Sequence, residues 1–127
     1  MEAQQHISAL HQDIESWKMD VDFVRKDVQY LRERLLEVAG KNSSREAMVQ
    51  VEHFQNLFLR QHEVADELFH DLKQANKSLR VAIQEVPALY GPVMEEEHSV
   101  LRERVEVFDK LFRELKNEFN NFLRKWM

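Results

Sequence analysis

The feature that most constrains this chain is the spacing of its apolar residues, which advance alternately by four and three positions along three long segments. The first set is Ala3, Ile7, Leu10, Ile14, Trp17, Val21, Val24, Val28, Leu31, Leu35 and Val38. The second is Ala47, Val51, Phe54, Phe58, the polar Gln61, Ala65, Leu68, Leu72, Ala75, Leu79, Ala82 and Val86. The third is Met94, the polar His98, Leu101, Val105, Phe108, Phe112, Leu115, Phe119, Phe122 and Trp126. A seven-residue repeat of this kind predicts three α-helices that pack through a shared apolar seam.

Turn-forming residues are scarce, because the 127 residues include only two glycines and two prolines. The first turn signal is AGKNSS, residues 39–44. Gly40 suits the left-handed position that follows many helices. Ser43 and Glu46 have the spacing of a capping box, in which Glu46 would reach back to the backbone of Ser43. A helix is therefore expected to end and another to begin here.

The second turn signal is VPALYGPV, residues 86–93. Pro87 should stop one helix, because proline lacks the backbone N–H that continues it. Pro92 can stand at the start of the next helix, where no N–H is needed. Together the two turns predict helices at about 2–39, 44–86 and 92–126.

Short connections make consecutive helices antiparallel neighbours. The expected fold is therefore all-α: an elongated, up-down-up three-helix coiled-coil bundle in which residues 1–127 form one domain. Counting back from the turns places Trp17, Leu68 and Phe112 in one layer. The same count puts His98 in a layer with Ala3 and Ala82.

By this count the third helix ends at the layer of Leu31 and Phe54. The tip of the first helical hairpin should then lack a third helix, and its uncovered seam residues would be Leu35, Val38, Ala47 and Val51. A second apolar set, Met19, Phe23 and Tyr30, lies outside the seam of the first helix. A weaker one, Val93, Val100 and Val107, lies outside the seam of the third. Exposed apolar sets of this kind are typical of protein interfaces, so the tip and the Met19 set are the predicted interaction residues.

Two Glu-x-x-His motifs, ELFH at 67–70 and EEEH at 95–98, raise the question of a di-iron carboxylate site. Such a site needs both residues of each motif inside a bundle, with further glutamates from two other helices. The heptad phase instead places Glu67 and His70 on the outer face. Only three helices are expected, so the spacing does not favour a ferritin-type centre.

His98 is the one histidine on the apolar seam. His6, Glu85 and Glu97 are expected near it, and imidazole and carboxylate groups together can bind zinc or iron. The alternative is a partly exposed histidine at the end of the rod, and nothing in the spacing requires a metal. We therefore expect no cofactor and keep a metal site at these four residues as the alternative.

Composition excludes several other classes of function. The net charge of −5 argues against nucleic-acid binding. No apolar run approaches the roughly 20 residues of a membrane span, and the start of the chain does not resemble a signal peptide. With no cysteine, a cytoplasmic protein is expected. The chain has no glycine-rich phosphate loop, and a filled seam leaves no substrate pocket. Neither an enzyme nor a small-molecule substrate is therefore expected.

Two resemblances accompany this interpretation. The three-helix heptad layout resembles a spectrin-type repeat, through Trp17 and LRQHEVADEL at 59–68, although the second helix is longer than such a repeat needs. Separately, VEHFQNLFLRQHEVADELFHDLKQ at 51–74 and RLLEVAGKN at 34–42 resemble a group of small uncharacterised bacterial all-helical proteins. The first resemblance implies architecture and the second implies no function.

The resulting hypothesis is a non-enzymatic coiled-coil module for protein–protein interaction or scaffolding. Its partner would be a second copy, giving a homodimer, or another helical protein.

Overall fold

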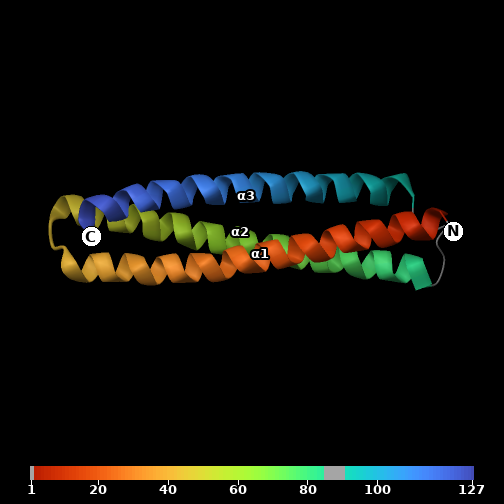
Figure 1. The fold of residues 1–127 in the computed structure, drawn as a ribbon, viewed down its shortest axis with the longest axis horizontal. Helices are drawn as coiled ribbons and strands as arrows, with labels where there is room; N and C mark the ends of the chain where they lie inside the picture. Colours follow the sequence, from red (N-terminus) through yellow and green to blue (C-terminus); the bar gives the residue numbers. More distant parts are fainter. Residues whose placement is uncertain (1, 85–90) are drawn as a thin grey trace.

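The computed structural model describes the backbone of residues 2–84 and 91–127, and all of their side chains except those of residues 2–4 and 83. The described chain forms three helices: α1 (Glu2–Lys41), α2 (Arg45–Gln84) and α3 (Pro92–Trp126). Figure 1 shows them side by side in one rod, with α1 and α3 running in one direction and α2 in the other. The expected all-α, elongated, up-down-up three-helix bundle is confirmed.

The predicted seam is the core of this rod. On α1 every described seam position from Ile7 to Val38 is buried, except for Trp17, which is partly buried. A cluster of four phenylalanine rings fills the half of the core nearest the α1–α2 turn, with centroids 5.0 Å apart for Phe58–Phe119 and for Phe54–Phe122. Phe58 and Phe119 are fully buried. The heptad pattern thus identified the apolar face of each helix.

The first turn differs in detail from the expectation. α1 continues through Gly40 to Lys41, and no described glycine has a positive φ. Asn42 ends the helix instead, since its backbone and side-chain N–H groups both donate to the Val38 carbonyl, at 3.1 and 3.0 Å. The hydroxyl of Ser44 accepts a hydrogen bond from the Ala47 N–H at 3.1 Å. Ser44, rather than Ser43, is therefore the N-cap of α2.

The uncovered hairpin tip is a wrong prediction, because α3 extends to the α1–α2 turn. The Asn42 side chain donates to the Trp126 carbonyl at 3.1 Å. Lys125 forms an ion pair of 2.9 Å with Glu46, which therefore does not serve the capping box. All four tip residues are at most 7% exposed within a single chain: Leu35, Val38, Ala47 and Val51. These four residues belong to the core of the bundle and are not available to a partner.

The error lies in the axial register of the helices. The expected layer of Trp17, Leu68 and Phe112 does not form around Trp17, whose ring lies 4.9 Å from that of His98. A heptad pattern looks the same after a shift of about seven residues, so it selects the buried face but not the height at which helices meet.

The second turn lies largely outside the described residues. Glu85, Val86 and Pro87 belong to the undescribed segment 85–90, so the predicted end of the second helix at 86 falls there. α3 begins at Pro92 after Gly91, as the sequence predicts.

Candidate functional site

The outer face of α1 carries three large apolar side chains in contact with solvent. Met19, Phe23 and Tyr30 are 74%, 65% and 57% exposed. Because they are separated by four and seven positions, they lie on one side of the helix, away from the seam. We call this surface the α1 face. Its exposure agrees with the sequence interpretation.

Ion pairs border the α1 face. Asp22 pairs with Arg25 at 2.6 Å and with Lys26 at 3.1 Å, and the Arg25 and Lys26 side chains hold the pKa of Asp22 below its ordinary value. Arg25 also reaches Asp66 on α2 at 3.1 Å, with its guanidinium 4.1 Å from the centre of the Phe69 ring. Lys26, three residues after Phe23 and four before Tyr30, lies between them on the face. Aromatic side chains accompanied by charged groups are a usual composition of a protein interface.

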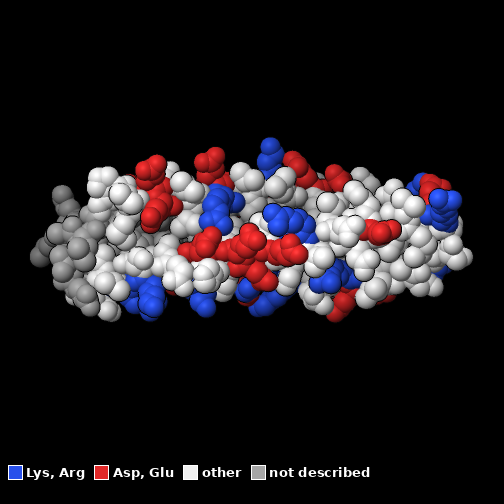
Figure 2. All heavy atoms as spheres, turned by 180° about the vertical axis from the view of Figure 1, so that it is seen from behind, with Lys and Arg blue, Asp and Glu red and all other residues white. Residues whose placement is uncertain are grey.

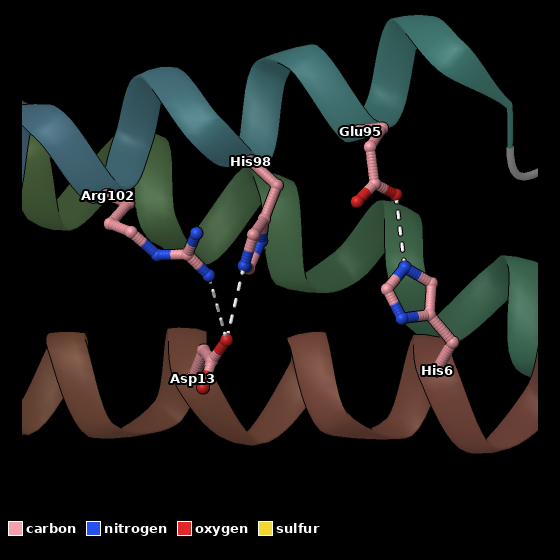
Figure 3. A network of polar contacts seen from close by, with 5 residues as sticks. All are labelled: His6, Asp13, Glu95, His98 and Arg102. Carbon is pink, nitrogen blue, oxygen red and sulfur yellow. Dashed lines mark hydrogen bonds and ion pairs between the residues drawn. The ribbon is translucent and has the colours of Figure 1, made fainter.

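His98 lies in the contact between α3 and α1. Its Nε2 atom is 3.3 Å from the Asp13 carboxylate, and Arg102 approaches the same oxygen at 3.5 Å. Figure 3 shows both side chains directed at Asp13. Burial lowers the pKa of His98, while the hydrogen bond to Asp13 opposes that effect. The ring is therefore a packed, hydrogen-bonded histidine beside Trp17 rather than one at the end of the rod.

The residues of the metal alternative are not assembled. His6 contacts Glu95 at 3.1 Å, whereas His98 contacts Asp13 (Figure 3). Glu97 is exposed beside α2, and Glu85 lies outside the described residues. Nowhere in the described part of the chain do three histidine, aspartate or glutamate side chains form a group that could bind a metal.

The layer expected around His98, with Ala3 and Ala82, is also wrong. The small hollow beside the His98 side chain is lined by Ile14 and Leu79. His98 therefore packs at the level of Ile14 of α1, about three helical turns beyond the expected Ala3. The ELFH motif does behave as expected, because Glu67 and His70 are both exposed.

Sequence reasoning missed a ladder of polar pairs between α1 and α3. Every seventh residue of α1 faces every seventh residue of α3: His6 with Glu95, Asp13 with Arg102, Asp20 with Asp109, and Asp27 with Lys116. Among the ion pairs of this ladder the last is the shortest, at 2.7 Å. Paired positions beside an apolar seam are where supercoiled parallel helices place complementary charges.

One pair in this ladder is not complementary. The carboxyl groups of Asp20 and Asp109 share a hydrogen bond, which requires a proton on one of them. Burial, followed by this hydrogen bond and the negative charge of Asp20, raises the pKa of Asp109 to about 7, and Arg113 partly opposes the rise. The α1–α3 contact therefore contains one carboxyl group, that of Asp109, whose pKa is near neutral pH.

A groove runs between α2 and α3 on another side of the rod. Two hollows in it, of about 490 and 480 Å³, are both lined by Val100 and Arg104, and a third of about 430 Å³ lies beside Met94. We call this surface the α2–α3 groove. Val93, Val100, Val107 and Leu111 of α3 line it and are exposed.

Two buried amides of α2 lie at or beside the seam. Gln61 borders the α2–α3 groove, and its buried side-chain nitrogen has no hydrogen-bond partner among the described residues. Asn76 is 1% exposed, and its amide nitrogen donates to Glu15 of α1. The sequence interpretation chose the neighbouring Ala75 for the seam. Because the step from Leu68 to Leu72 is already four residues, strict alternation selects Ala75 next, so spacing alone could not have shown that Asn76 is the buried residue.

Acidic and basic side chains are mixed over the surface. Figure 2 shows a run of acidic side chains along the middle of one face, bordered by basic ones. No helix within the described residues is long and apolar enough to cross a membrane.

Comparison with protein-family models, with curated proteins and with solved structures finds no match to this chain. The functional interpretation therefore depends on the surfaces described above.

Proposed function

We propose that this chain is a non-enzymatic helical module that binds a second copy of itself or another helical protein through the α1 face. The observation that carries the proposal is the exposure of Met19, Phe23 and Tyr30 on one side of one helix. Single exposed apolar residues are ordinary. Large apolar side chains grouped on one helix face beside ion-paired residues instead favour a contact surface.

The residue types also support this proposal. Tyrosine, phenylalanine and methionine are enriched at protein interfaces, where they provide large contact areas. Burying one such side chain in a partner contributes about 1.5–3 kcal/mol. A helix of the partner that lies along α1 would cover all three, because they follow the helix axis.

The polar groups support a binding module rather than a catalyst. The pKa values of His98 and Asp109 both depart from their ordinary values, and each group is engaged with a residue of α1. Their charge states affect the stability of the α1–α3 contact, and the two side chains lie at separate places along α3. This arrangement favours structural roles for the ionisable residues.

The experiment is a comparison of Phe23→Glu with Leu36→Glu by light scattering over a dilution series. Leu36 has the same 65% exposure on the same helix. At 100° per residue it points away from the α1 face, which makes it a matched control. Phe23→Glu should weaken assembly about tenfold or more, because a charge would be buried in the contact. Leu36→Glu should assemble as the wild type does.

Circular dichroism establishes that both variants keep the helical rod. Equal assembly of Phe23→Glu, Leu36→Glu and wild type, together with equal affinity for any helical partner, would show that the α1 face is ordinary surface.

A further inference from the structure

We infer that the α2–α3 groove is a two-fold interface through which two copies of this chain pair side by side, in antiparallel orientation. The inference rests on the proposed interaction function and names a second copy as the partner. It uses a surface distinct from the α1 face, so the two can be tested separately.

The groove provides both hollows and protruding side chains. Two of its hollows have nearly equal volumes, about 490 and 480 Å³, and they meet at Val100 and Arg104. Val93 stands exposed at the outer end of one hollow, and Leu111 at the outer end of the other. Each end therefore has a cavity and an apolar side chain that could fill a cavity.

A two-fold axis near Val100 and Arg104 brings the hollows of one copy opposite the protruding side chains of the other. It lays the Val93 end of one copy over the Leu111 end of the other. Leu111 of each copy then enters the hollow beside Val93 of its partner, and Val93 enters the hollow beside Leu111. An interface of this kind is closed, because the same patch serves both copies. The pairing therefore gives a dimer rather than a filament.

The polar residues at the two ends are complementary in the same arrangement. Asp71, Glu96 and Glu97 line the Val93 end, Arg60 and Glu103 line the Leu111 end, and Arg104 lies where the two hollows meet. Antiparallel pairing places the carboxylates of the Val93 end opposite Arg60, whereas parallel pairing would place them opposite one another, which favours the antiparallel orientation. Gln61, only 9% exposed at the Leu111 end, has an unpartnered amide nitrogen among the described residues. Rotation of the Gln61 side chain into the groove would let this nitrogen donate a hydrogen bond to a carboxylate from the Val93 end of the second copy.

The groove is large enough for a weak dimer. From Val93 to Leu111 it is about 27 Å long at 1.5 Å per residue, and two helices are about 20 Å wide. A contact of this size buries on the order of 1,000 Å² in total, which is the lower end of specific interfaces. The dimer should therefore dissociate on dilution.

Cysteine cross-linking tests the orientation directly, because the native chain contains no cysteine. Val100→Cys lies near the proposed axis and should form a disulfide with its own copy under mild oxidation. Val93→Cys alone should not cross-link, but a mixture of Val93→Cys and Leu111→Cys should. Val49→Cys, an exposed valine on the outer side of α2, is the control that reports random collisions. Cross-linking of Val93→Cys to itself, or no more cross-linking of Val100→Cys than of Val49→Cys, overturns the arrangement.

Light scattering separates this inference from the proposed function. Val107→Glu should raise the dimer dissociation constant about tenfold or more, whereas Val49→Glu should leave it unchanged. If Val107→Glu has no effect while Phe23→Glu abolishes assembly, the groove inference is wrong and the result supports binding through the α1 face. If the wild type is monomeric up to millimolar concentration, the groove inference is also wrong. The α1 face is then tested by binding of a purified helical partner with Phe23→Glu as control.

Discussion

The Asp20–Asp109 pair is the residue-scale feature with the clearest consequence for stability. Its neighbours in the α1–α3 ladder join groups that can carry opposite charge, such as Asp13 with Arg102, whereas this pair joins two acids. Like charges at facing positions destabilise a helix contact. A shared proton removes that repulsion, so protonation of the pair should strengthen the contact.

We therefore expect Asp109→Asn to change how stability depends on pH. The pKa of Asp109 is raised from 3.8 to about 7 in the folded chain, so its stabilising contribution is fully present below pH 3.8 and is lost progressively as pH rises from 3.8 through about 7. The amide that this substitution introduces can donate a hydrogen bond to Asp20 at any pH, because it needs no added proton. At pH 8 the variant should be more stable than the wild type by about 1 kcal/mol, a value that allows for screening of a partly exposed group.

The measurement is the free energy of unfolding in urea at pH 5.5 and pH 8. Glu106→Gln, on an exposed position of the same helix, is the matched control for loss of one carboxylate. The pH dependence of stability that His98 introduces has the opposite sign. Burial lowers its pKa below 6.5, so its contribution to the free energy of unfolding is lost as pH falls. Each comparison is therefore made between variants at the same pH. Parallel pH profiles for wild type and Asp109→Asn would refute the shared proton.

At the scale of the element, the start of α2 shows how one hydroxyl locates a helix end. Ser43 and Ser44 are adjacent, and either could cap a helix by residue type. Only Ser44 accepts the Ala47 N–H. Glu46, which a capping box would direct backwards, pairs with Lys125 of α3 instead. A tertiary contact thus overrides a local motif.

Ser44→Ala should destabilise the chain by about 1 kcal/mol, the usual effect of removing an N-cap hydroxyl. Ser43→Ala, one residue earlier in the same turn, should change the free energy of unfolding by less than about 0.5 kcal/mol. Urea unfolding followed by circular dichroism measures both. The reverse order of effects would assign the cap to Ser43.

At the scale of the whole molecule, the rod has one core whose two halves differ in composition. The half near the α1–α2 turn contains a cluster of four phenylalanine rings, in which Phe54 contacts Phe119 and Phe122 and Phe58 contacts Phe119. The other half includes the polar His98 and Asn76 beside aliphatic residues. Aromatic side chains contribute more buried area each, so the first half should contribute more to stability.

Phe119→Ala should lower the free energy of unfolding by about 3–5 kcal/mol, because it empties a fully buried site. Trp126 lies at the α1–α2 turn beside Asn42, whereas Trp17 lies beside His98 in the other half of the rod. Single-tryptophan variants, Trp17→Phe and Trp126→Phe, therefore report each half by fluorescence. Coincident urea transitions at both tryptophans are expected for one cooperative core. Separate transitions would show that the halves unfold independently.

The sequence alone determined the number of helices, their buried faces and the places of the turns, because these depend on local periodicity and on proline and capping chemistry. It also placed Met19, Phe23 and Tyr30 outside the seam, since their positions follow from the same repeat. Tertiary structure decided the axial register between the helices, because the repeat is unchanged by a shift of about one heptad. That register covers Leu35 and Val38 with the end of α3, aligns the α1–α3 ladder and opens the α2–α3 groove. These features require contacts between segments far apart in the chain, and packing of whole side chains selects among the equivalent registers.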